Sequence, residues 1–168
     1  FNQQMSFPRE LTLKTTPEGI RLYRRPIKEI ETLHAKKHAW ANQVLKPGED
    51  LLSGVSGELF DIRAEIEPGK AAAFGFEIRG QKVGYLAAKK QLFALGRDAP
   101  LAPEQGRIKL QVLVDRTSVE VFGNDGRVSL SSCFLPDLDN QSLRAYTAGG
   151  EVKILSLEVY ELRSAWPE

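Results

Sequence analysis

Three charged residues lie close together in residues 114–126, whose sequence is VDRTSVEVFGNDG. Asp115 and Arg116 are adjacent, and Glu120 follows between two valines of an apolar run. A carboxylate beside a guanidinium offers acceptors and fixed donors that match neighbouring hydroxyl groups of a sugar. The same groups can also form a structural polar cluster. Residue types and spacing leave both interpretations of this segment open.

Glu120 has two interpretations of its own. On a strand, Ser118, Glu120 and Phe122 share one face, and the flanking valines share the other. Because glutamate is rarely buried without a partner, the plainest expectation is a solvated side chain on the outer face. The alternative pairs Glu120 with Arg116 or Arg79 in a polar cluster that is either structural or able to bind a polyol.

No catalytic, metal or cofactor site is expected within the chain. Glycosidic hydrolysis usually requires two carboxyl groups about 5 to 10 Å apart. With 22 acidic residues such a pair arises by chance, and no segment gives two of them a recognisable catalytic context. His34 and His38 have the spacing of helical metal ligands, but the two lysines between them favour a solvated loop. The single cysteine, Cys133, excludes an internal disulfide and a zinc site built of cysteines.

Composition predicts a globular domain with a sizeable core. The chain has 168 residues, of which 42% are hydrophobic and 27% are charged. A formal net charge of +1 leaves no basic surplus to neutralise phosphates, so no nucleic-acid partner is expected. No apolar run approaches the length of roughly 20 residues that spans a bilayer, so no membrane partner is expected.

The dominant period along the chain is two, which predicts strands with one buried and one wet face. In residues 58–67, for example, apolar side chains alternate with acidic and basic ones. Strands are expected at residues 10–14, 20–25, 28–33, 58–67, 71–79, 83–87, 91–95, 107–115, 117–122, 127–132, 142–147 and 151–162.

Turn signals organise these strands. Residues 123–126, GNDG, tolerate positive φ and predict a tight hairpin. A change of phase near Ile154 and Leu155 predicts a β-bulge in the last strand. Residues 97–100 are expected to form a loop. Short, evenly spaced antiparallel strands predict an all-β fold, an antiparallel two-sheet β-sandwich.

Several segments together resemble the C-terminal β-sandwich domain of glycoside hydrolase family 32, the β-fructosidases that include levanases, invertases and inulinases. Residues 5–11, MSFPREL, resemble the entry to that sandwich, and residues 114–126 resemble its most recognisable strand and hairpin. Residues 149–154 and 156–162, ending near Trp166, resemble its closing strands. The resemblance implies a jelly-roll or concanavalin-like sandwich over residues 9–168, with residues 1–8 as a connector from an upstream catalytic domain.

The same resemblance implies a non-catalytic role. The family's catalytic residues belong to an N-terminal five-bladed β-propeller, whose Trp-x-Asn-Asp-Pro motif and acid/base glutamate have no match here. Arg97 and Asp98 are followed by Ala99 where the family has proline. The implied partner is that propeller, which the module would stabilise or assist in substrate access. Because polymeric fructans are usually degraded outside the cytoplasm, the implied location is extracellular or periplasmic.

Carbohydrate-binding modules of family 66, which bind terminal fructosyl units of fructans, are also similar to this sandwich. That similarity implies a possible sugar site, although the stretch after Tyr85 lacks the acidic and Asp-Arg residues of the pattern. Aromatic side chains such as Trp40, Tyr146 and Trp166 offer stacking faces, but those of a sandwich more often pack in the core. A structural cluster, a fructan site and a protein–protein or oligomerisation surface are the three alternatives. The candidate sugar-binding residues are Glu58, Arg79, Tyr85, Asp115, Arg116 and Glu120.

Overall fold

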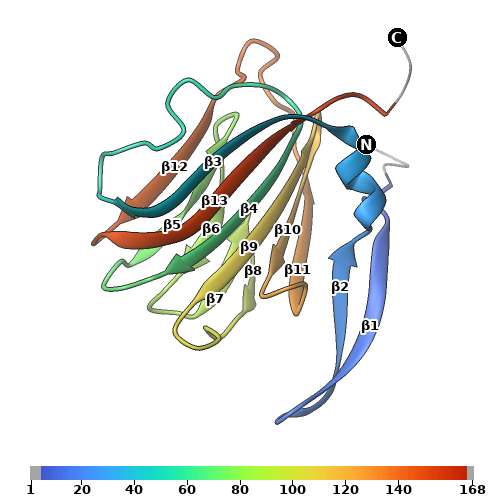
Figure 1. Ribbon diagram of the computed structural model, residues 1–168, viewed down its shortest axis with the longest axis vertical. Coiled ribbons are helices and arrows are strands. Elements are labelled where there is room, and N and C mark those ends of the chain that lie inside the picture. Colours follow the sequence, from blue (N-terminus) through green and yellow to red (C-terminus); the bar gives the residue numbers. More distant parts are fainter. Residues whose placement is uncertain (1–4, 166–168) are drawn as a thin grey trace.

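Antiparallel strands dominate the computed structural model, which describes residues 5–165 (Figure 1). One short 3-10 helix, η1 (Lys28–Leu33), lies between the second and third strands. The strands are β1 (Arg9–Thr16), β2 (Gly19–Pro26), β3 (His34–Leu45), β4 (Phe60–Glu67), β5 (Ala73–Ile78), β6 (Gln81–Leu86), β7 (Gln91–Ala94), β8 (Arg97–Pro100), β9 (Ile108–Asp115), β10 (Ser118–Gly123), β11 (Val128–Cys133), β12 (Leu143–Ala148) and β13 (Val152–Leu162).

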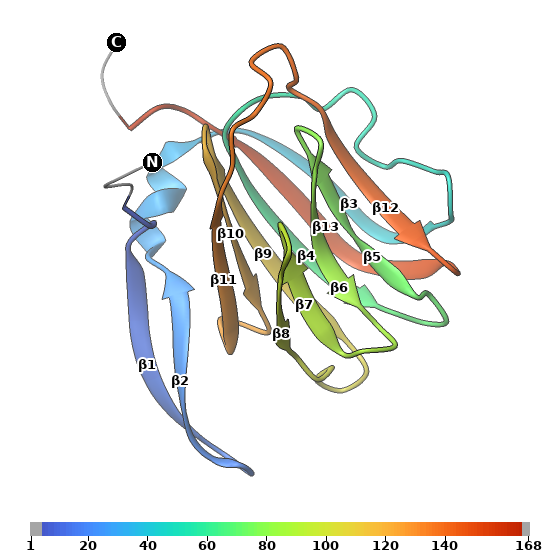
Figure 2. The ribbon, with the colours of Figure 1, turned by 180° about the vertical axis from the view of Figure 1, so that it is seen from behind.

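Two sheets face each other, as Figures 1 and 2 show from opposite sides. One has six strands in the order β11-β10-β9-β4-β13-β3, and the other has five in the order β12-β5-β6-β7-β8. Their inward side chains form one apolar core, in which Phe60 and Ile62 of the first sheet belong with Phe74 and Phe76 of the second. The predicted all-β, antiparallel two-sheet sandwich is therefore confirmed.

β1 and β2 pair only with each other and lie beside the sandwich as a separate ribbon (Figure 1). They therefore belong to neither sheet, although residues 9–26 were expected to form part of the sandwich domain. The backbone N–H of Arg24 on β2 donates to the carbonyl of Gly126 at 2.9 Å. Gly126 has φ +84°, and a Cβ there would lie 2.1 Å from the Arg24 carbonyl oxygen. A glycine is therefore needed where the ribbon meets the β10–β11 turn.

The predicted strand at residues 28–33 is wrong, because this segment forms η1. Its buried residue, Ile30, packs against Leu113 and Phe122 on the outer side of the six-stranded sheet. The Thr32 hydroxyl donates to the Glu29 carbonyl at 2.7 Å and closes the turn locally. The segment thus buries Ile30 alone against the outside of the sheet, whereas a strand would have buried every second residue.

Two strands formed where the sequence predicted none. His34 and His38 belong to β3, which pairs along β13 at the edge of its sheet, so the expected solvated loop is wrong. Residues 97–100 form β8, the edge strand that pairs with β7, and not a loop. Edge strands contact one neighbour and are largely exposed, so neither segment shows the alternation that identifies a half-buried strand.

Two local predictions are confirmed. β10 and β11 form the expected hairpin, in which Asn124, Asp125 and Gly126 all have positive φ. The register between β13 and β4 shifts between Ile154 and Ser156, as the change of phase predicts. The bulge lets apolar residues on both sides of Leu155 reach the same core.

Candidate functional site

Four of the predicted sugar-binding residues meet at one end of the sandwich. Arg79, in the turn after β5, is buried, and its Nε donates to the Asn140 carbonyl at 2.9 Å. Its Nη1 donates to the Arg116 carbonyl at 3.0 Å. Glu58 lies between the two arginines, with Oε1 4.0 Å from Arg79 Nη2 and Oε2 3.2 Å from Arg116 Nε. Asp115 accepts the backbone N–H of Arg116 at 2.8 Å.

This end cluster, Glu58, Arg79, Asp115 and Arg116, is first of all structural. The Arg79 guanidinium joins the loop that contains Asn140 to the β9–β10 turn, and two of its five N–H groups bind carbonyl groups in doing so. The Arg116 side chain is exposed and that of Glu58 is half-buried beside a hollow of about 270 Å³. Both side chains offer accessible polar groups to a ligand at this end.

Glu120 lies elsewhere, on the outward face of β10. It is only 1% exposed, so the solvated interpretation is wrong. The N–H of Phe7 donates to Oε1 at 2.8 Å, and the Arg9 guanidinium pairs with Oε2. Its partner is therefore Arg9 and not Arg116 or Arg79. Nothing in the local pattern indicates this pair, because Arg9 is 111 residues away along the chain.

The aromatic candidates are mainly packing residues. Tyr85 is fully buried and its hydroxyl donates to the Leu101 carbonyl at 2.8 Å, so it is not accessible for stacking on a sugar. Trp40 packs against the core from β3. Burial, together with the nearby Glu77 carboxylate, raises the pKa of Tyr146 to about 12. Trp166 lies outside the described residues.

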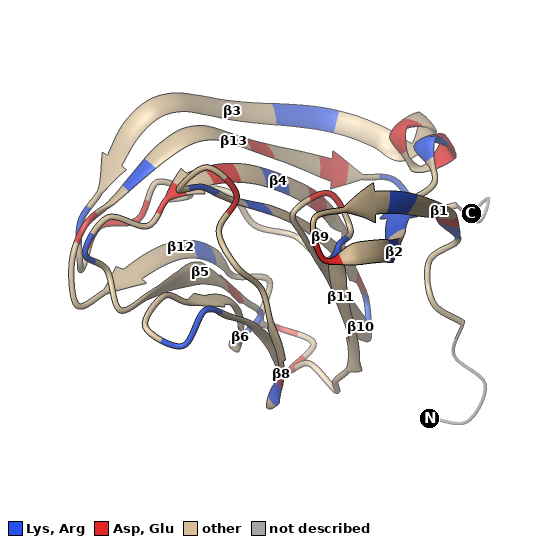
Figure 3. Cartoon of the chain, turned by 90° about the horizontal axis from the view of Figure 1, so that it is seen from below, with Lys and Arg blue, Asp and Glu red and all other residues tan. Residues whose placement is uncertain are grey.

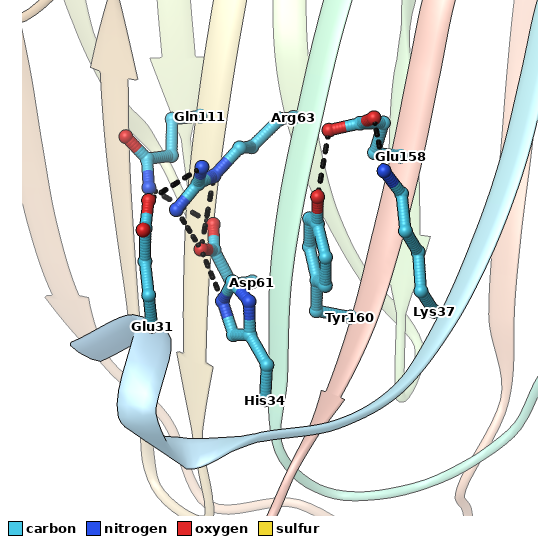
Figure 4. Close-up of polar contacts among 8 residues, drawn as sticks. All are labelled: Glu31, His34, Lys37, Asp61, Arg63, Gln111, Glu158 and Tyr160. Atoms are coloured by element: carbon cyan, nitrogen blue, oxygen red, sulfur yellow. Dashed lines mark hydrogen bonds and ion pairs between the residues drawn. The ribbon is translucent and has the colours of Figure 1, made fainter. Parts of the chain in front are cut away.

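A second polar cluster lies on the outer face of the six-stranded sheet (Figure 4). Its centre is Asp61 of β4, which is 0% exposed. Asp61 accepts Nε and Nη2 of Arg63 at 3.0 and 2.7 Å and Nε2 of Gln111 at 2.9 Å. Nε2 of His34 lies 3.1 Å from the same carboxylate. Three strands thus supply the donors that a buried carboxylate requires.

This outer-face cluster extends in two directions. Arg63 Nη1 pairs with Glu31 of η1 at 2.9 Å, which fixes the helix to the sheet. Burial lowers the pKa of Arg63, but hydrogen bonds and attraction from Asp61 and Glu31 outweigh it, and the net shift is upward. Toward β13, the Tyr160 hydroxyl donates to Glu158 at 2.9 Å. A hydrogen bond from Lys37 to Glu158 is the main reason why the pKa of Glu158 is lowered.

Alternation on β4 predicted that Asp61 and Arg63 lie on the face opposite the core, and the structure confirms it. Register then sets Arg63 opposite Gln111 on β9. The burial of Asp61 and the cluster itself were not predicted, because η1 and β3, from which Glu31 and His34 come, were both assigned wrongly.

A polar groove of about 370 Å³ separates this cluster from the β1–β2 ribbon. Its walls come from β1, β2, η1 and the β10–β11 turn, and its floor comes from β4, β9 and β13. Figure 3, which views the molecule from below, shows both acidic and basic residues along the six-stranded sheet and the ribbon. Among residues 5–165, no three His, Cys, Asp or Glu side chains are placed to hold a metal ion. No helix in the described part of the chain is long and apolar enough to cross a bilayer.

The ribbon has one apolar face without a cover. Cross-strand pairing puts Leu11, Leu13 and Ile20 on the same face, opposite the one whose Glu10 and Arg25 side chains line the groove. The three apolar side chains are 63%, 70% and 66% exposed. A contiguous exposed apolar face of this kind marks a site of interaction.

Known proteins resemble this chain over nearly its whole length. The family model described as "Glycosyl hydrolases family 32 C terminal" matches residues 29–161. Levanases from Bacillus subtilis (strain 168) and Bacillus sp. (strain L7) are each 40% identical and are matched over 96% and 98% of this chain. The chain spans only 27% and 20% of their respective lengths. The crystal structure of exo-inulinase from Aspergillus awamori superposes with a TM-score of 0.82 at 26% identity, covering 96% of this chain and 36% of that one.

Proposed function

The chain belongs to glycoside hydrolase family 32, as its C-terminal domain, and we propose that it is the non-catalytic module of a fructan-hydrolysing β-fructosidase of the levanase type. The family match over residues 29–161 is the observation that carries this proposal. The levanase relatives are four to five times longer than the region they share with the chain, which leaves room for a separate catalytic domain. The extracellular or periplasmic location is proposed because a relative from Aspergillus awamori, 27% identical, is named an extracellular exo-inulinase.

The partner that we propose is the upstream catalytic domain, which the family resemblance describes as a five-bladed propeller. Its docking surface is the apolar face of the ribbon, made by Leu11, Leu13 and Ile20. The ribbon precedes the family match at residue 29, and it pairs with neither sheet of the sandwich. Isolated two-stranded ribbons are marginally stable in water. Contact with an upstream domain would bury the apolar face and stabilise both parts.

A fructosyl-binding site at the end cluster is a second candidate function. Glu58 and Arg116 support it, because Glu58 lines a hollow and the side chain of Arg116, which pairs with it, is exposed to solvent. Arg79 argues against it, because the residue is buried and its Nε and Nη1 already bind carbonyl groups of the protein. Calorimetry with levan and inulin oligosaccharides separates the two functions. Heat that disappears in the Arg116→Ala variant would support binding at this end.

The proposed function is tested by turnover. The purified chain is expected to release no fructose from sucrose, inulin or levan, whereas the longer polypeptide that contains it is expected to release fructose. Activity that stays with the isolated chain through successive purification steps would overturn the proposal. So would a longer polypeptide that hydrolyses none of these β-fructosides.

A further inference from the structure

We propose that the groove between the ribbon and the outer-face cluster binds a neutral oligosaccharide. The sugar class, a short fructan segment, rests on the proposed function, but the site itself rests on the groove. Its volume of about 370 Å³ falls within the range of roughly 300 to 1,000 Å³ that small-molecule sites occupy. It is distinct from the end cluster, which shares none of its lining residues.

The floor of the groove is fixed in advance of binding. Asp61 is fully buried and holds both Arg63 and Gln111 by hydrogen bonds (Figure 4). Because the amide nitrogen of Gln111 faces Asp61, its amide oxygen is directed away from Asp61 and is available to a hydroxyl group. Side chains locked by buried partners lose little conformational entropy when a ligand binds, and that favours affinity.

Unused polar groups surround this floor. The side chains of Glu10, Lys28 and Ser156 line the groove, and within residues 5–165 they have no hydrogen-bond or ion-pair partner. Together they supply a carboxylate acceptor, an ammonium donor and a hydroxyl that can act as either. Neighbouring hydroxyl groups on a sugar need this mixture of donors and acceptors. Pro26 and Ile27 add apolar surface for the ring carbons.

The charge of the groove favours a neutral ligand over an ion. Acidic and basic side chains are present in nearly equal numbers. The net charge of the groove therefore attracts neither an anion nor a cation strongly. A ligand rich in hydroxyl groups can bind both kinds of side chain at once. The acidic lining residues are Glu10, Glu31, Glu65, Asp125 and Glu158, and the basic ones are Arg25, Lys28, Arg63 and Lys109.

The test is a titration of the ¹⁵N-labelled chain, followed by nuclear magnetic resonance, with an inulin-type or levan-type oligosaccharide of a few fructosyl residues. Saturable shifts are expected at the Gln111 side-chain amide and at the backbone amides of Ile27 and Ser156. The Gln111→Leu variant, which leaves Asp61 its contacts with Arg63 and His34, is expected to weaken binding about tenfold. Lys28→Ala changes an exposed side chain outside the cluster and is expected to weaken binding severalfold without affecting the fold.

The matched control is Gln43→Leu, the same substitution on the exposed edge strand β3, which is expected to leave affinity unchanged. Shifts confined to Glu58 and Arg116 would overturn the groove site and support the end cluster instead. Absence of saturable shifts would also overturn it. So would an affinity of the Gln111→Leu and Lys28→Ala variants equal to that of the unmodified chain. Equal binding of maltotriose would overturn the assignment to fructans. The turnover assay above is independent of all these results.

Discussion

At the residue scale, two buried carboxylates hold the outer face together. Asp61 and Glu120 both point away from the core, yet they are 0% and 1% exposed. Each is bound by residues distant in sequence, His34 and Gln111 for Asp61 and Phe7 and Arg9 for Glu120. Alternation predicts which face a strand residue occupies, but it does not reveal what covers that face. The burial of these two groups was therefore beyond sequence reasoning.

The pair between Arg9 and Glu120 is expected to contribute measurably to stability. Among residues 5–165, Arg9→Met leaves this buried carboxylate with the Phe7 N–H as its remaining partner, and should lower the free energy of unfolding by about 3 kcal/mol. Urea denaturation measures this loss. The control, Arg21→Met, removes an exposed ion pair with Glu18 and should change the free energy by no more than about 0.5 kcal/mol. Equal effects of the two variants would contradict the account.

Stability is also expected to depend on pH through Glu158 and Glu161. Hydrogen bonds from Lys37 and His38 respectively lower the pKa of each carboxyl below its usual 4.5. A lowered folded-state pKa contributes stability that is present above pH 4.5 and lost as the pH falls through the folded-state value.

Replacing both residues by glutamine should lower the free energy of unfolding at neutral pH and flatten its decline below pH 4.5. Urea denaturation at a series of pH values measures both effects. A decline as steep as that of the unmodified chain would show that these carboxyls do not contribute.

At the element scale, a period of two identified the central strands because one face of each packs in the core. The same reasoning failed at η1, β3 and β8, where tertiary contacts at an edge or outside the sheet replace core burial. β3 has 12 residues and pairs with β13 along most of its length, but its sequence, HAKKHAWANQVL, shows no apolar alternation. Its strand conformation is set by backbone pairing with a neighbour, which a single sequence does not show.

The attachment of the ribbon is expected to depend on Gly126. Gly126→Ala puts a Cβ about 2 Å from the Arg24 carbonyl and requires the ribbon to move. Gly106→Ala is the matched control, because its φ of +77° is similar and nothing lies within 4 Å of the added carbon. Both variants carry the strain of a left-handed backbone conformation. The free energy of unfolding should fall by at least about 1 kcal/mol more in Gly126→Ala than in Gly106→Ala.

Hydrogen exchange at the Arg24 amide, which donates to Gly126, should become faster only in the Gly126→Ala variant. Identical stability and exchange in the two variants would mean that the ribbon is not fixed at this turn.

At the scale of the whole molecule, the chain is a closed sandwich with an attached ribbon whose apolar face is open. The core of the sandwich is formed without the ribbon. The exposed apolar side chains of the ribbon are not part of that core. The period of two predicted the two-sheet fold, and the resemblance of residues 5–11, 114–126, 149–154 and 156–162 to the family predicted the domain type. The polar groove was not predicted, since it requires the position of the ribbon relative to the sheet.

The central claim is that this module supports an upstream catalytic domain through the ribbon. The most direct measurement produces that upstream segment and this chain as separate polypeptides and determines their affinity by calorimetry. The account predicts a complex of one copy of each. Combined Leu11→Thr, Leu13→Thr and Ile20→Thr substitutions should weaken it at least about tenfold without changing the unfolding midpoint of the isolated chain. Unchanged affinity in the triple variant, or no complex with the original chain, would contradict the claim.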